Sequence, residues 1–353
     1  MSETRYRPEE LANFAEALFA AAGLDAGKAR VVADLLVEAD LLGHTTHGLA
    51  LAAPYLGDVE KGGMVATGEP GVVRDKGACL TWDGRRLPGV WLAARAVDEA
   101  VGRAERLGTG TVVVRNSHHI ACLAAFLTRA TDRGMMVILA SSDPSVASVA
   151  PFGGTLAVFT PNPIAVGIPT GGDPVLVDVS TSVTTNGMSG RLSAEGRRFD
   201  HPWLLDAEGG PTDDPAVLFA EPPGTILPVG GLDHGHKGYG LTLMVEALTQ
   251  GLGGFGRAEA PTAWGASFVV QALDPEAFAG LADFTRETAH VARLCKESPP
   301  RPGVEAVRLP GEAALARKRR ALAEGVALYP GVMPALEPWA RRLGVEPPRQ
   351  TRG

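Results

Sequence analysis

Two histidines occur close together in Gly43–Gly48, GHTTHG, directly after an apolar helical pattern. Imidazole titrates near neutral pH and binds metals, so the pair suits a metal half-site, an acid–base group or a polar loop. His47 has Thr46 before it and Gly48 after it, which gives a hydroxyl neighbour and close access for a substrate. The acid–base interpretation therefore favours His47 over His44.

Two further histidine pairs, His118-His119 and His234/His236, also fall between apolar segments. Metal sites with histidine usually add acidic partners at short spacing, and HExxH is absent from the sequence. We therefore predict no metal site. A metal-dependent hydrolase that uses the clustered histidines is the alternative.

A glycine-rich stretch, DHGHKGYGLTLMVEAL, begins at Asp233. We expect a helix to start near Lys237, so that free backbone N–H groups and one ammonium form an anion site. A flexible loop with a solvated lysine is the alternative. Further upstream, the apolar run Val175–Val179 leads into Ser180 and neighbouring hydroxyls. Its Asp178 could hold a histidine or a ribose, or only cap a turn.

The segment Gly251–Gly256 matches GxGxxG, the dinucleotide-binding fingerprint. That motif binds pyrophosphate when a strand precedes it and a helix follows. Here LTLMVEALTQ before the glycines has a helical pattern, so the glycines would cap a helix C-terminus. The chain therefore lacks a recognisable Rossmann turn.

The surrounding pattern predicts helices at both chain ends and an α/β middle. The first seventy residues contain two apolar helical patterns, the second ending at Gly43, and the last forty-five return to helix. From Gly71 on, β-branched runs alternate with helical patterns, which is typical of α/β proteins. The expected strands are 111–114, 135–140, 163–169, 175–179 and 267–273.

The overall composition is that of an ordinary globular protein. The 353 residues carry a formal net charge of −7 and 45% hydrophobic residues, which argues against a nucleic-acid or anionic-membrane surface. No apolar run reaches the length of a membrane span, and the N-terminus does not resemble a secretory signal. Three scattered cysteines fit reduced thiols, so we expect a cytoplasmic protein.

Eight stretches in order resemble the malate/L-lactate dehydrogenase family that is unrelated to the Rossmann-fold malate and lactate dehydrogenases. That family includes sulfolactate, ureidoglycolate and diketogulonate oxidoreductases. The stretches are ADLLGHTTHG (39–48), VVVRNSHHIA (112–121), TPNPIAVGIP (160–169), VDVSTS (177–182), LLDAEGGPTDDP (204–215), ILPVGG (226–231), HKGYGL (236–241) and RLPGE (308–312).

The resemblance implies an α/β fold, with a non-Rossmann three-layer domain that contains a mixed, largely antiparallel sheet. A helical domain would be built from both chain ends. The implied boundaries are a helical part at 1–72, an NAD(P)-binding α/β domain at 73–307, and C-terminal helices at 308–353 that pack back on the helical part. A homodimer is also expected from the resemblance.

The implied activity is hydride transfer between NAD or NADP and a 2-hydroxy or 2-oxo acid. By resemblance His47 is the proton donor and acceptor, with Thr46 and Asp178 as catalytic neighbours, and Asp178 is the candidate that orients the imidazole. The cofactor contacts carried over are His119, Asn162, Val177, Asp178, Ser180, His236, Lys237, Gly238, Pro310, Gly311 and Glu312.

Several positions depart from the family pattern. Leu51 stands where an arginine commonly grips the substrate carboxylate, and Met188 stands where lysine is common. Arg115 or Arg191 could replace the missing arginine. Without a replacement, the substrate differs or the chain is a catalytically weakened, cofactor-binding family member.

Overall fold

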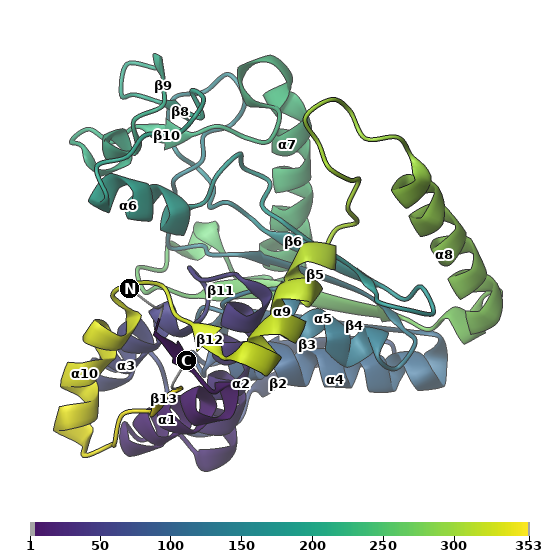
Figure 1. Cartoon of the computed structure of the whole chain (residues 1–353), viewed down its shortest axis with the longest axis horizontal. Helices are drawn as coiled ribbons and strands as arrows, with labels where there is room; N and C mark the ends of the chain where they lie inside the picture. Colours follow the sequence, from purple (N-terminus) through teal and green to yellow (C-terminus); the bar gives the residue numbers. More distant parts are fainter. Residues whose placement is uncertain (1–3, 352–353) are drawn as a thin grey trace.

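A seven-stranded sheet forms the centre of the protein, whose computed structural model describes residues 4–351 (Figure 1). The strand order is β2-β3-β4-β11-β5-β6-β7. The pair β3–β4 is parallel, and the other neighbouring pairs in this sheet are antiparallel. The prediction of a mixed, largely antiparallel sheet is therefore confirmed. The strands are β2 (Gly71–Lys76), β3 (Cys79–Asp83), β4 (Thr109–Ser117), β5 (Met136–Ser142), β6 (Ile164–Ile168), β7 (Val175–Val179) and β11 (Ala266–Leu273).

Strand β11 lies between β4 and β5, although it is distant from both in sequence. Its Val269 pairs with Val113 on one side and with Ala140 on the other. Nearly all of its residues are buried, as expected for a central strand covered on both faces. This strand ties the late part of the chain to the middle of the sheet.

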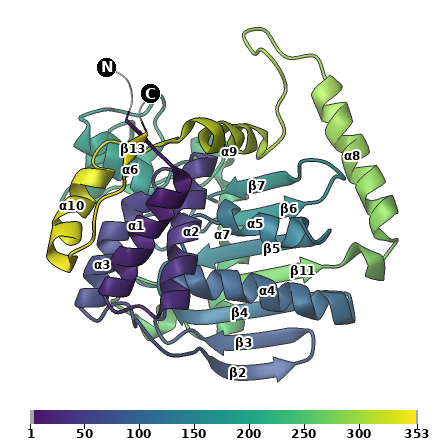
Figure 2. The ribbon, with the colours of Figure 1, turned by 60° about the horizontal axis from the view of Figure 1, so that its bottom comes forward.

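Helices cover both faces of the sheet (Figures 1 and 2). On one face lie α4 (Gly89–Leu107), which packs on β4 and β11, and α5 (Ala124–Thr131), which packs on β6. On the other face lies α7 (Gly231–Glu246), followed by the π-helical segment Ala247–Gly251, which packs on β5 and β11. The predicted three layers are thus helix, sheet and helix.

Both ends of the chain meet in a helical layer beside the sheet. Arg5 pairs with Ala327 and with Thr351 in a small sheet of order β12-β1-β13. One hydrophobic core runs from these helices into the large sheet, and the expected boundaries at residues 72 and 307 remain a prediction. The elements of this layer are β1 (Arg5–Tyr6), α1 (Pro8–Ala21), α2 (Ala26–Leu42), α3 (Ala52–Glu60), α9 (Glu312–Glu324), β12 (Val326–Ala327), α10 (Val332–Leu343) and β13 (Gln350–Thr351).

Two further parts leave the large sheet. A three-stranded sheet of order β10-β8-β9 packs with α6 (Asn186–Ala194) around a small separate core. Helix α8 (Leu281–Glu297) stands away from the other elements, and none of its residues is buried (Figure 2). The remaining short elements are β8 (Leu204–Leu205), β9 (Pro211–Thr212), β10 (Thr225–Ile226) and the 3-10 turns Leu49–Leu51, Pro215–Phe219, Arg257–Glu259 and Pro275–Ala277.

The structure agrees with the rejection of the dinucleotide fingerprint. Gly251 ends the π-helical segment that continues α7, so the glycines follow a helix rather than a strand. Their backbone N–H groups therefore do not meet the positive end of a following helix dipole. Among residues 4–351, no helix combines the length and the apolar character that a bilayer crossing requires.

Candidate active site

A buried aspartate packs against the GHTTHG turn and accepts a hydrogen bond from the residue that follows it. Helix α2 ends at Gly43, whose φ of 88° is left-handed. Asp40 in the last turn of α2 accepts a 2.7 Å hydrogen bond from the backbone N–H of Leu49. A Cβ at Gly48 would lie 2.3 Å from the Asp40 carboxyl carbon, so only glycine fits beneath the turn. Burial raises the pKa of Asp40 to about 7.

His47 lies on this turn and lines the main pocket. The Thr46 hydroxyl is 2.8 Å from Nδ1 of His47. Burial, followed by the neighbouring His44 and Arg191, lowers the pKa of His47 to about 4. The unliganded protein therefore holds a neutral imidazole at neutral pH, with one ring nitrogen beside a hydroxyl.

A second imidazole, His119, lies 6.0 Å from His47 between ring centroids. Its Nδ1 is 2.7 Å from the Tyr55 hydroxyl, and its ring stacks on Trp264 at 4.6 Å. Burial is the main cause that holds the pKa of His119 well below its usual range, and the neighbouring His47 and His118 lower it further. The sequence prediction missed Tyr55 and Trp264, which fix this ring in place.

His118 is buried next to a carboxylate, which is typical of a histidine with a structural role. It is fully buried, and its Nε2 lies 2.9 Å from the Asp58 carboxylate. Burial lowers the pKa of His118 to about 4 even though Asp58 favours the protonated ring. The two adjacent histidines both contact the rings of Tyr55 and Trp264, but His118 pairs with a carboxylate whereas His119 meets a hydroxyl.

The main pocket has a volume of about 470 Å³ and brings together five of the predicted site residues. These five residues are Thr46, His47, His119, Asp178 and Ser180. His44, which the sequence favoured less than His47 for acid–base chemistry, also lines the pocket, as do Leu51 and Met188. No lysine or arginine is among the described residues of this lining.

Asp178 does not lie where the expected partner of His47 would lie. Its Oδ2 accepts a 2.8 Å hydrogen bond from the Ala124 N–H and lies 3.7 Å from the Cys122 sulfur. His44 is the histidine beside it. Within the described chain Asp178 makes no hydrogen bond to His47, whose Nδ1 instead meets Thr46. The structure therefore does not support Asp178 as the orienting group.

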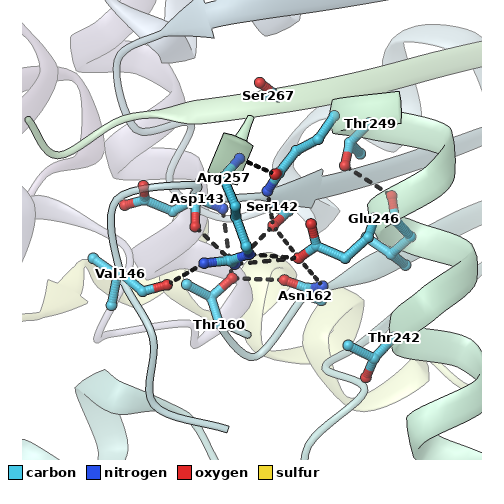
Figure 3. A network of polar contacts seen from close by, with 12 residues as sticks. Ser142, Asp143, Val146, Thr160, Asn162, Thr242, Glu246, Thr249, Arg257 and Ser267 are labelled. Carbon is cyan, nitrogen blue, oxygen red and sulfur yellow. Dashed lines mark hydrogen bonds and ion pairs between the residues drawn. The ribbon is translucent and has the colours of Figure 1, made fainter. Parts of the chain in front are cut away.

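Asn162 is fully buried and belongs to a network of polar contacts (Figure 3). Its amide donates to Glu246 at 2.8 Å, and its carbonyl accepts from Thr160 at 2.6 Å. Arg257 joins this network through Glu246 and through the carbonyl of Val146. Since Thr160 and Val146 line the pocket, the network fixes the shape of that wall.

The glycine-rich stretch does not form the expected helix start. Helix α7 begins at Gly231, so Lys237 lies in its second turn. Backbone N–H groups there already donate hydrogen bonds to carbonyls within the helix. His236 and Lys237 are exposed, and neither lines the main pocket. A Cβ at Gly238 would lie 2.4 Å from the Val229 nitrogen, so this glycine permits close packing.

The segment Pro310–Glu312 lies at the edge strand β7. The Leu176 N–H donates to the Pro310 carbonyl at 3.1 Å, and a Cβ at Gly311 would come within 2.7 Å of Leu176. The Glu312 carboxylate accepts a 3.0 Å hydrogen bond from the Leu309 N–H and pairs with Lys296. This segment therefore packs on Leu176, the residue before Val177 in the strand that carries Asp178, but outside the main pocket lining.

Two arginines were candidates to replace the one missing at Leu51. Arg191 of α6 reaches the turn and donates to the Thr45 hydroxyl at 3.0 Å. Arg115 lies with Asp83, 3.4 Å away, and faces the carbonyl of Gly253. Arg191 is therefore the arginine that acts on the His47 turn, although neither side chain lines the pocket.

The non-Rossmann sheet and a pocket walled by neutral histidines and hydroxyls define an α/β enzyme with acid–base capacity. The family model for malate/L-lactate dehydrogenase matches residues 6–337. The chain belongs to the malate/L-lactate dehydrogenase family, and it is a hydroxy-acid dehydrogenase. The resemblance noted from the sequence is thereby confirmed, in place of the hydrolase alternative.

Three relatives illustrate the similarity. The chain is 30% identical to the L-lactate dehydrogenase of Cupriavidus necator, over 94% of this chain and 95% of the relative. It is 33% identical to a (2R)-3-sulfolactate dehydrogenase (NADP(+)) of Chromohalobacter salexigens, over 69% and 71%. The solved malate dehydrogenase of Pyrococcus horikoshii superposes with a TM-score of 0.87 at 28% identity, covering 97% and 96%.

Proposed function

We propose that the enzyme moves a hydride between NAD or NADP and the C2 carbon of a 2-hydroxy acid, with His47 exchanging the hydroxyl proton. The observation that carries this proposal is the position of His47 on the pocket wall, with Nδ1 held by Thr46 at 2.8 Å. Its Nε2 has no hydrogen-bond partner within residues 4–351, so this nitrogen is free to meet a substrate oxygen. When bound, the nicotinamide supplies or accepts the hydride.

The proton chemistry follows from the neutral ring. During oxidation, His47 accepts the hydroxyl proton as C2 loses hydride, and during reduction the imidazolium returns that proton to the carbonyl oxygen. With a pKa of about 4, the free enzyme already holds the base form. A substrate carboxylate in the pocket favours the imidazolium through its negative charge, which raises the pKa of His47 toward the working pH.

The test of His47 is its replacement by asparagine. We expect His47→Asn to lower kcat by about 10²–10⁴-fold, while cofactor binding, followed by nicotinamide fluorescence, changes little. His201→Asn is the matched control, because His201 is exposed and lies outside the pocket. Turnover that survives in His47→Asn at the wild-type level would remove His47 from the reaction.

The cofactor is proposed to be NAD or NADP, bound along the pocket and the adjacent end of β7. The fit rests on the lining, which contains the hydroxyl residues Ser180 and Thr160 and the stacked rings of His119 and Trp264. One relative is named as an NADP(+) enzyme. Outside the pocket, Lys237 is proposed to contact the phosphates. Lys237→Met should then raise the KM of the cofactor, most strongly for NADP, and leave the KM of the acid unchanged.

A weaker catalyst is the second candidate function. The observation that favours it is the absence of lysine and arginine among the described lining residues, since a carboxylate normally meets a cation. A reductase screen of 2-oxo acids and cyclic imines with NADH and NADPH separates the two. Turnover identifies the substrate class, whereas cofactor binding without turnover supports the weakened family member.

The oligomer is proposed to be a homodimer, based on two uncovered apolar faces. On α8, Val291 and Leu294 are 58% and 51% exposed, and on α7 Leu241 and Leu243 are 43% and 47% exposed. Exposed apolar groups repeated on two helices are typical of subunit contacts. Light scattering should give twice the chain mass, and Val291→Glu with Leu294→Glu should reduce it to one chain. A wild-type monomer would refute this arrangement.

A cytoplasmic location is proposed from the thiols. Cys79, Cys122 and Cys295 are all free, and two of them are exposed. Unpaired exposed thiols suit a reducing compartment. Fractionation of the native host should recover the enzyme with cytoplasmic markers.

A further inference from the structure

Three metal-ligating side chains meet in the pocket wall beside the proposed catalytic turn. They are His44 at the end of α2, Cys122 before α5 and Asp178 at the end of β7. Their ligating atoms all lie within 4.8 Å of one another, and all three residues line the pocket. None of these side chains was assigned to a metal from the sequence, because the three residues lie far apart in the chain.

From this geometry we infer a binding site for one zinc ion, or a similarly soft divalent cation, between His44, Cys122 and Asp178. Tetrahedral zinc with bonds of about 2.0–2.3 Å sets its ligand atoms about 3.3–3.8 Å apart. The 3.7 Å between the Cys122 sulfur and Asp178 Oδ2 already has this spacing. Small side-chain movements bring His44 to the same distance.

The surroundings favour a bound cation. The Ala124 N–H holds the Asp178 carboxylate at 2.8 Å, which is the usual role of an outer hydrogen bond at a metal site. A thiolate, a carboxylate and a neutral imidazole together cancel the charge of a divalent ion, so the complex is neutral inside the pocket. No ammonium or guanidinium in the described lining opposes the ion.

Metal binding requires that the Cys122 thiol lose its proton to solvent, and that Asp178 be ionised. The affinity therefore falls as the pH falls, and each bound ion releases protons. The three residues supply three ligands and line the pocket, so water or an anionic ligand from the pocket would complete a tetrahedron.

The site is tested by direct binding to the purified full chain, so its outcome is independent of any dehydrogenase assay. Cobalt(II) is added as the probe and followed by its visible d–d bands and its near-ultraviolet thiolate charge-transfer band. We expect saturation at one equivalent per chain, displacement of cobalt by zinc, and proton release that differs between buffers in calorimetry. Absence of a stoichiometric thiolate band would overturn the inference.

Matched variants locate the ion. Cys122→Ser should remove the charge-transfer band and weaken zinc binding by at least about 100-fold, and His44→Gln should weaken it by at least about 10-fold. Cys295→Ser and His234→Gln change an exposed cysteine and an exposed histidine elsewhere and should bind as the wild type does. A band that persists in a folded Cys122→Ser protein, as judged by circular dichroism, would place the metal elsewhere and refute the site.

Discussion

The guanidinium of Arg191 donates two hydrogen bonds to Thr45, at 3.0 Å to the side-chain hydroxyl and at 3.2 Å to the main-chain oxygen. Its carbon also lies 3.4 Å from the centre of the Tyr329 ring. Arg191 thus connects α6, the helix that carries Met188 of the pocket wall, to the turn that carries His47. Its positive charge adds to the lowering of the pKa of His47 by burial, and it opposes part of the rise that burial causes in the pKa of Asp40.

Removal of that charge should be visible in the pH dependence of catalysis. Arg191→Met eliminates a cation that disfavours imidazolium, so the pKa of His47 should rise above about 4. In the direction of oxidation His47 must be neutral, and kcat/KM reports the free enzyme. The acidic limb of the kcat/KM profile for oxidation should then move to higher pH. Arg191→Lys keeps the charge and should leave the limb close to its wild-type position. Identical profiles for Arg191→Met and wild type would mean that this charge does not act on the reacting base.

The Thr46 hydroxyl should matter through the orientation of His47. Thr46→Val removes the oxygen that lies 2.8 Å from Nδ1 but keeps the size of the side chain. We expect kcat to fall about 10-fold, which corresponds to about 1.4 kcal/mol, the value of one good hydrogen bond. Thr46→Ser retains the hydroxyl and should keep most of the activity. Equal rates for the valine and serine variants would show that the contact is dispensable.

Gly48 should be intolerant of a side chain because of Asp40 beneath it. In Gly48→Ala the new Cβ would lie 2.3–2.4 Å from the Asp40 carboxyl atoms, so the turn or the carboxylate must move. We expect a loss of about 2–3 kcal/mol in the free energy of unfolding, measured with urea. Gly27→Ala is the control, because a Cβ there meets nothing within 4 Å and should stabilise α2 slightly.

The origin of the Gly48 effect can be checked with a double variant. Asp40→Ala removes the carboxylate with which the Cβ of Gly48→Ala would clash. The cost of Gly48→Ala should therefore be smaller in the Asp40→Ala background than in the wild type. Additive costs would assign the loss to the backbone of the turn instead.

The sequence predicted those features that depend on local pattern. The β-branched runs at 111–114 and 175–179 became β4 and β7, because such residues fit a buried pleated sheet. The place of β11 between β4 and β5 has no local signal, since it depends on pairing across more than a hundred residues. β2 was missed because five of its six residues are exposed and three of the six carry charge.

The pocket was predictable to a similar extent. His47 and Thr46 were found because a glycine-bounded turn shows in the sequence, whereas Tyr55 and Trp264 look like ordinary aromatic residues until packing brings them to His119. The start of α7 was placed too late because Gly230 and Gly231, at its first positions, have positive φ and glycine has a low helix propensity. A carboxylate at position 40, inside an apolar helical pattern, was the available signal for a buried functional group.

Asp40 should make stability depend on pH in a way that asparagine removes. Its folded pKa of about 7 lies above the model-peptide value of 3.8, so the folded protein keeps a proton that the unfolded chain has lost. As pH rises from about 4 to about 7, ionisation of this carboxyl stabilises the unfolded state relative to the folded state. The free energy of unfolding of the wild type therefore decreases by up to about 4 kcal/mol because of this group. Asp40→Asn does not titrate, so its stability relative to wild type should increase over this interval and level off above it.

The measurement for Asp40 is urea unfolding of both proteins at pH 5, 6, 7 and 8. Asparagine can present its carbonyl to the Leu49 N–H and its amide to the side where Oδ1 now lacks a partner among the described residues. The difference in unfolding free energy, rather than either value alone, isolates this carboxyl, because His118 and His119 titrate equally in both proteins. A difference that stays constant from pH 5 to pH 8 would mean that Asp40 is ionised throughout, and that Arg191 and the Leu49 N–H outweigh the burial of the charge.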